Sequence, residues 1–166
     1  MKTNLLLLIL ICFIISSCKK DYNNTPKPTV RKDIFECKVN GQLWLPEASF
    51  PENALTSSFQ NNLFVLLANR SIGGNNPIYE EISYSGYFSS MEESDFNGIN
   101  HIISFRKIIN GNYHKYIVDS AHNGKITITK LDTIAGIIAA TFYFDAIDTT
   151  TNEVVHIIEG RFDVKY

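Results

Sequence analysis

The sequence has no excess of charge of either sign. Fifteen lysine and arginine residues stand against 17 aspartate and glutamate residues in a chain of 166. A protein that binds nucleic acid through phosphates needs a basic stripe on its surface, and no such stripe is visible here. No acidic tail occurs either. The charge pattern therefore excludes nucleic acid as a partner.

A hydrophobic run long enough to span a membrane is also missing. The N-terminal run Leu5–Ile15 has eleven apolar residues, and an α-helix of that length covers about 16 Å at ~1.5 Å per residue. A bilayer core needs about 20 residues. A single lysine, Lys2, precedes the run and small residues follow it. This layout is typical of a secretory signal peptide.

The end of the run carries a second signal. Ile15-Ser16-Ser17-Cys18 resembles the lipobox of bacterial lipoproteins. The resemblance implies a thioether-linked diacylglycerol on Cys18, cleavage before it and acylation of the new amino group. The alternative is an ordinary cleaved signal whose cysteine is incidental. We predict that residues 1–17 are a lipoprotein signal peptide and that Cys18 is lipidated, which attaches the protein permanently because each buried methylene contributes about 0.8 kcal/mol.

Cysteine is scarce, with three in the chain. Cys12 leaves with the signal peptide, and an acylated Cys18 leaves Cys37 without an intrachain partner. A lone cysteine outside the cytoplasm is either a reactive thiol or a small buried hydrophobe. Because Cys37 lies in a strand-like segment, we expect it to be buried and no disulfide to form.

Residues 18–32 have almost no apolar side chains. The stretch after Cys18 reads KKDYNNTPKPTVRK, which cannot bury enough surface to fold by itself. We interpret it as a flexible tether between the lipid and a domain at residues 33–166. Lys19 directly after Cys18 predicts delivery to the outer membrane by analogy with lipoprotein sorting. Lys20-Asp21 matches only part of a surface-export signal, so the periplasmic and extracellular faces both stay open.

The domain lacks any helical period and alternates with period two instead. Asn-Gly, the pair best suited to the positive φ angles of a type I′ turn, occurs four times after Ile34. The sequence predicts a single all-β domain, an antiparallel meander of about eight to ten strands packed as a sandwich or a flattened barrel. The four pairs are Asn40-Gly41, Asn97-Gly98, Asn110-Gly111 and Asn123-Gly124.

The two-residue turns also predict the register of the flanking strands. Around Asn40-Gly41, Val39 faces Gln42 and Cys37 faces Trp44. Around Asn110-Gly111 we expect three pairs, Ile103 with Val118, Phe105 with Tyr116 and Lys107 with His114.

Further strands are expected on both sides of these hairpins. A third hairpin is predicted at His122–Lys125, followed by a strand with Ile126 and Ile128 on one face. In the last strand we expect Val154, Ile158, Phe162 and Val164 to share the buried face. The remaining predicted strands are 56–60, 63–69, 78–88, 137–147 and 153–166.

Both ends of the domain resemble one family. FECKVNGQLWLPE at the start and TFYFDAIDTTTNEVVHIIEGRFDVKY at the end look like a family of small Bacteroidota lipoproteins of uncharacterised function. That family tends to show F-x-x-K-V-N-G-x-x-W after its tether and G-x-F-x-V at its end. Residues 47–100 lie outside the resemblance. Where the family usually has Ser-Gly-Thr-Phe, this chain has Ala139-Ala140-Thr141-Phe142, so that position accepts a Cβ. The resemblance implies a fold and a location, but no activity.

Motifs for catalysis and metal binding are incomplete. Ser104-Phe105-Arg106-Lys107 matches S-x-x-K, but a strand would turn its serine and lysine to opposite faces. His101 and His114 could approach each other across their hairpin and bind a metal with Glu93 or Asp95, although zinc needs three or four ligands. A calcium site could be formed by Glu92, Asp95 and Asn97, but these residues lack the usual spacing of a calcium loop. We expect no enzyme, no metal and no cofactor.

Aromatic residues are the remaining lead. Exposed tyrosines on a rigid sheet can form a surface for sugars or proteins. They can equally fill a β core, which we consider the simpler interpretation. The residues in question are Tyr79, Tyr84, Tyr87, Phe88, Tyr113 and Tyr116.

Together these features predict a monomeric, lipid-anchored lipoprotein of the outer membrane, held by acyl chains on Cys18. We expect a non-enzymatic binding or structural module whose ligand is a glycan or a protein. The alternative is a lipocalin-like carrier of a small apolar ligand, which would need a closed barrel with an internal cavity.

Overall fold

A computed structural model describes residues 32–47, 53–73, 77–96 and 99–166. The chain divides into two units, Met1–Arg31 and Lys32–Tyr166. The predicted signal peptide, Cys18 and the tether up to residue 31 lie outside the described residues. Every described strand and the hydrophobic core lie within Lys32–Tyr166, so this unit holds the contacts that a folded domain needs.

The described residues form eleven antiparallel strands and no helix. The predicted all-β class is therefore confirmed, with one strand more than the expected range because the short β6 was not foreseen. No helix that could cross a membrane occurs in this part of the chain. The strands are β1 (Ile34–Val39), β2 (Gln42–Trp44), β3 (Leu55–Gln60), β4 (Leu63–Ile72), β5 (Ile78–Tyr87), β6 (Glu93–Asp95), β7 (His101–Ile109), β8 (Asn112–Ile117), β9 (Gly124–Asp132), β10 (Ile137–Asp148) and β11 (Val154–Lys165).

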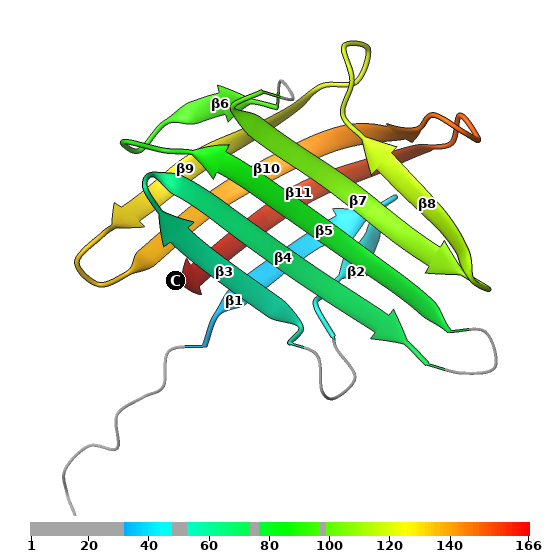
Figure 1. The fold of residues 1–166 in the computed structure, drawn as a ribbon, viewed down its shortest axis with the longest axis horizontal. Helices are drawn as coiled ribbons and strands as arrows, with labels where there is room; N and C mark the ends of the chain where they lie inside the picture. Colours follow the sequence, from blue (N-terminus) through cyan, green and yellow to red (C-terminus); the bar gives the residue numbers. More distant parts are fainter. Residues whose placement is uncertain (1–31, 48–52, 74–76, 97–98) are drawn as a thin grey trace, which may run out of the picture. The chain divides into compact units, whose positions relative to one another are not determined.

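All strands belong to one sheet that is not closed into a barrel, which is consistent with a sandwich or a flattened barrel. Strands β3, β4, β5, β7 and β8 form a front layer that crosses over a back layer of β1, β2, β9, β10 and β11 (Figure 1). The layers join where β8 pairs with β10, through Ile117 with Ile147 and Tyr116 with Asp148. We call this short joint the seam.

Two of the predicted hairpins are confirmed. At the β1–β2 turn the φ angles of Asn40 and Gly41 are 49° and 79°, and Cys37 pairs with Trp44. The β7–β8 turn at Asn110-Gly111 has φ angles of 52° and 78°. Its strands pair Phe105 with Tyr116 and Lys107 with His114, as expected. The turn chemistry of Asn-Gly therefore determined both registers.

The third predicted hairpin is wrong. Residue Gly124 does not lie in a turn but begins β9 and pairs with Phe144 of β10. A Cβ on Gly124 would lie 2.4 Å from the Cβ of Phe144, so a glycine is needed there for close packing. The segment before β9 instead carries the chain from the front layer to the back layer. Asn97-Gly98 lies outside the described residues.

The predicted buried face of the last strand is correct only in its second half. Phe162 and Val164 are buried, but Val154 is only half-buried and Ile158 is 41% exposed. A bulge around Glu159, whose φ is 53°, explains the difference because the extra residue reverses the alternation. Before the bulge the buried residues are Val155 and Ile157 instead.

Aromatic side chains fill the space between the layers. Phe64 of the front layer stacks on Phe162 of the back layer at 5.6 Å between ring centroids. Trp44 and Phe144 are fully buried as well. Burying each such side chain contributes roughly 2 kcal/mol. Cys37 is buried among them, as predicted, and this burial raises its pKa to about 12 despite the opposing charge of Arg70.

The packing of Phe142 over Gly160 gives a first prediction. A Cβ at Gly160 would lie 2.4 Å from the Phe142 ring, and the two residues pair across β10 and β11. Gly160→Ala should lower the free energy of unfolding by about 2 kcal/mol through overpacking, measured by urea denaturation of the chain from Lys19 to Tyr166. Gly73→Ala, where no atom lies within 4 Å of the new Cβ, is the matched control. Equal midpoints for the two variants would contradict this account of the packing.

Candidate functional site

The outer face of the front layer, turned away from the back layer, carries an unusual polar row. Asn69, Glu81 and Arg106 are cross-strand neighbours on β4, β5 and β7. The next row on this face holds Tyr79 and Tyr113, which flank Ile108. Strand pairing therefore places two tyrosines beside a row of hydrogen-bonding side chains.

Hydrogen bonds connect the two rows. The Tyr79 hydroxyl lies 2.9 Å from Oδ1 of Asn69 and 3.2 Å from Oε2 of Glu81. The guanidinium of Arg106 donates to the other oxygen of Glu81. Glu81 is only 5% exposed although it lies on the outer face, which shows that its neighbours cover it. We call Asn69, Tyr79, Glu81, Arg106 and Tyr113 the tyrosine platform.

The hydroxyl of Tyr79 reaches two residues along its own strand to Glu81. The Tyr79 side chain is half-buried. Glu81 raises the pKa of Arg106 through a hydrogen bond, against the effect of burial, and Tyr113 adds to the rise. Tyr113 itself is 55% exposed. The platform is thus charged at its centre, with the exposed Tyr113 and the half-buried Tyr79 beside this charge.

The sequence did not separate this platform from the core. Of the six aromatic residues singled out, Tyr84, Phe88 and Tyr116 are buried, so the simpler interpretation is confirmed for them. Tyr87 and Tyr113 are exposed. Sequence reasoning missed Glu81 and the other polar members of the platform. The available signal was a pair of adjacent glutamates inside an apolar strand, which needs partners on neighbouring strands.

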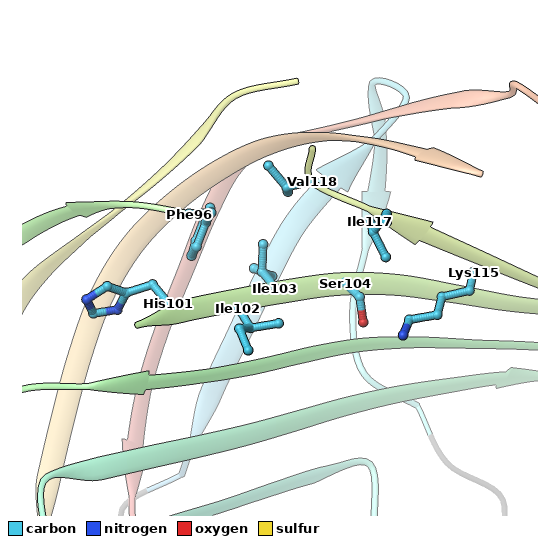
Figure 2. Close-up of a pocket in the computed structure, with 8 residues that line it drawn as sticks. All are labelled: Phe96, His101, Ile102, Ile103, Ser104, Lys115, Ile117 and Val118. Atoms are coloured by element: carbon cyan, nitrogen blue, oxygen red, sulfur yellow. The ribbon is translucent and has the colours of Figure 1, made fainter. Parts of the chain in front are cut away.

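A pocket lies beside the seam. Its volume is about 200 Å³, and it opens where β8 leaves β7 (Figure 2). The predicted pairing of Ile103 with Val118 is not formed, because the β7–β8 ladder stops at Ser104 and Ile117. Figure 2 shows Ser104 and Lys115 on one side of β7, with Phe96 and Val118 on the other.

One end of this seam pocket is closed by His101. Its Nδ1 lies 2.9 Å from the hydroxyl of Tyr84, and burial lowers the pKa of the imidazole. Burial also raises the pKa of Tyr84. The ring is therefore neutral near pH 7, and the two side chains satisfy each other.

The proposed approach of His101 to His114 is wrong. His114 pairs with Lys107, six residues along β7 from His101, which is about 20 Å at ~3.3 Å per residue. Glu93 lies on β6 and forms an ion pair with Lys125 at 2.7 Å. Within the described ranges no three metal-ligating side chains come together. Asn97, named for calcium, lies outside those ranges.

The S-x-x-K match has the geometry expected of a strand. Ser104 Oγ lies 2.8 Å from Ser83 Oγ on the outer face. Lys107 lies on the inner face, with Nζ 3.8 Å from Oε1 of Glu80. The two side chains point to opposite sides of β7, so the serine has no lysine beside it.

Glu80 is the centre of a buried polar cluster between the layers. Trp44 Nε1 donates to its Oε2 at 2.8 Å, and Arg70 lies 3.0 Å from the same oxygen. The guanidinium of Arg70 also lies over the Trp44 ring, 5.8 Å from its centroid. Lys107 contributes a second cation. Because Trp44 belongs to the back layer and Glu80 to the front layer, this cluster connects them.

The seam has polar contacts of its own. The Tyr116 hydroxyl donates to Glu153 at 2.8 Å, and His114 Nδ1 lies 3.0 Å from Oδ2 of Asp148. The hydrogen bond from the backbone N–H of Thr150 lowers the pKa of Asp148, and the hydrogen bond with His114 lowers it further. Burial, together with Glu153, raises the pKa of Tyr116. These residues brace the joint between β8 and β10.

The buried cluster gives a second prediction. Glu80→Gln leaves Arg70 and Lys107 without a carboxylate and should lower the free energy of unfolding by about 3 kcal/mol, measured by urea denaturation. Glu93→Gln is the matched control, because its ion pair with Lys125 is exposed and surface pairs contribute little. An unchanged midpoint for Glu80→Gln would show that the cluster does not hold the layers together.

Comparison of the chain with protein-family models, with curated proteins and with solved structures found no match in any of the three. The resemblance of the two ends of the domain to Bacteroidota lipoproteins therefore stays a prediction.

Proposed function

We propose that this protein is a cell-envelope lipoprotein, anchored in the outer membrane by acyl chains on Cys18, whose β domain binds a glycan through the tyrosine platform. The observation that carries the proposal is the Tyr79–Glu81–Arg106 network on an outer face of the sheet. This network places a few charged and hydrogen-bonding groups beside exposed aromatic surface, which is a combination typical of ligand-binding sites.

The chemistry of the platform suits a sugar better than a flat apolar partner. A pyranose ring presents C–H groups on its faces and hydroxyls around its edge. The exposed tyrosine surface can stack against these C–H faces. The guanidinium of Arg106 can donate to the hydroxyls. The Asn69 amide, in contrast, already bonds Tyr79 and the carbonyl of Asn53 and serves to hold the Tyr79 hydroxyl in place.

Attachment to the membrane rests on the sequence before the domain. The Ile15–Cys18 segment has the branched and small residues that lipoprotein processing requires. The segment from Lys19 to Arg31 is polar and proline-containing, which is suited to a tether. A domain on such a tether can face glycans of the cell surface if the lipoprotein is exported, and those of the periplasm if it is not.

The lipocalin-like carrier receives less support. A carrier needs a closed barrel around a cavity, whereas this sheet is open and large side chains such as Trp44, Phe64 and Phe144 fill the space between its layers. The platform, by contrast, lies on an accessible face.

The platform gives a third prediction. Tyr113→Ala should weaken binding to a glycan identified on an array of envelope and extracellular polysaccharides by about tenfold, or about 1.4 kcal/mol, measured by calorimetry. Tyr143→Ala removes another exposed tyrosine, from the back layer, and should leave the affinity unchanged. The proposal fails if the wild-type domain binds no glycan on the array, or if Tyr113→Ala and Tyr143→Ala bind the glycan with the same affinity.

Lipidation gives a fourth prediction. The native protein should carry palmitate and have the mass of a chain cleaved before Cys18, whereas Cys18→Ala should be neither acylated nor cleaved there. Intact mass and palmitate labelling test this directly. Protease treatment of whole cells, with lysed cells as the control, then shows which face of the membrane carries the domain. An unacylated wild-type protein would rule out the anchor.

A further inference from the structure

We propose that the seam pocket is a second binding site, independent of the tyrosine platform, that takes a small amphipathic carboxylate. The head group would lie between Lys115 and Ser104, with its apolar tail directed toward Phe96. Four observations support this assignment, namely the size of the pocket, the polarity of its two sides, the charge of Lys115 and the free backbone edge of β7.

The size of the pocket limits the ligand. Its volume is about 200 Å³, and a water-sized group takes about 30 Å³ of liquid volume, so roughly seven such groups fit. This is less than a drug-sized ligand needs. A carboxylate with an aliphatic chain of about six carbons, or a small aromatic acid, has the right dimensions by the same estimate.

The lining is mixed on one side and apolar on the other. Ser104 and Lys115 lie on the side of the outer face beside Ile102 and Ile117, while Ile103, Val118 and Phe96 form the opposite wall (Figure 2). Ile103 is buried, and Val118 packs against the hydrophobic core. A ligand with one charged end and one apolar end matches this division, and a uniformly polar ligand does not.

The charge on the polar side favours an anion. Lys115 is exposed and forms no ion pair with any part of the chain that the structure describes. Ser104 and Ser83 share one hydrogen bond in which either can be the donor, so the second hydroxyl hydrogen is available to a ligand. His101 at the other end of the pocket bonds to Tyr84 and adds no second charge. One carboxylate therefore balances the site.

The backbone of β7 adds a donor. In a two-residue hairpin, alternate residues direct their N–H and C=O groups to the partner strand. On β7 the odd-numbered residues direct these groups to β8, and the even-numbered residues direct them to β5. Asn100 agrees with this alternation, because its carbonyl accepts a hydrogen bond from the N–H of Tyr87 in β5. The ladder to β8 stops at Ser104, so Ile103 turns its N–H to the seam without a strand partner among the described residues. This N–H can donate to a ligand oxygen.

The test uses the straight-chain carboxylates from acetate to dodecanoate, with 1-octanol as an uncharged probe, titrated into the chain from Lys19 to Tyr166. Affinity, followed by calorimetry and by amide chemical shifts, should rise to about seven carbons, which is the carboxyl carbon plus a tail of about six, and then level off, because longer tails no longer fit the volume. Octanoate should bind at least about tenfold more tightly than 1-octanol, and its shifts should centre on residues 101–104 and 115–118.

Three variants complete the test. Lys115→Met keeps the apolar stem and should weaken octanoate binding about tenfold, while Lys130→Met removes an exposed lysine of β9 and should have no effect. Val118→Trp fills the pocket and should abolish binding, with urea denaturation to confirm folding. Tyr113→Ala should leave octanoate binding intact, which separates this site from the glycan platform.

The proposal is overturned if no acid binds saturably. It is equally overturned if affinity climbs steadily with chain length and ignores Lys115→Met and Val118→Trp, because that pattern marks unspecific adsorption to apolar surface.

Discussion

A buried carboxylate, Glu80, connects the two layers of this protein away from the seam. Glu80 of the front layer accepts a hydrogen bond from Trp44 of the back layer and lies beside Arg70 and Lys107. A carboxylate in such a place is tolerated only when it is paired and hydrogen-bonded, because taking a bare charge out of water costs several kcal/mol. The layers must therefore pack with Trp44 against β5, and this constraint positions the β1–β2 hairpin without any disulfide among the described residues.

Glu81, the next residue of β5, points to the opposite face of the sheet from Glu80. Successive residues of a strand point to opposite faces, so Glu81 lies on the outer face while Glu80 points inward. Each carboxylate meets an arginine, Arg70 inside and Arg106 outside. Two adjacent acids in β5 thus organise two different structures. One connects the layers, and the other holds the tyrosine platform for which we propose glycan binding.

The seam determines where the free edge of β7 and the seam pocket lie. Strands β8 and β10 pair through two residue pairs, and β8 turns away from β7 beyond Ile117. That early departure leaves the first residues of β7 with a free edge and opens the seam pocket. The platform and the pocket are neighbours on the same pair of strands, since Arg106 pairs with Lys115. Both sites therefore depend on the position of the β7–β8 hairpin.

The sequence alone determined those features of the fold that depend on residues adjacent in the chain. Alternation predicted the all-β class, and Asn-Gly turns predicted the registers at Asn40 and Asn110, because turn conformation is a local property. The same signal failed at Asn123-Gly124, where close packing on Phe144 and not a turn requires the glycine. Alternation likewise failed at the bulge around Glu159. Only the tertiary structure decided the partners of Glu80 and Glu81, the seam and its pocket, because each depends on strands that are far apart in the chain and are brought together by packing.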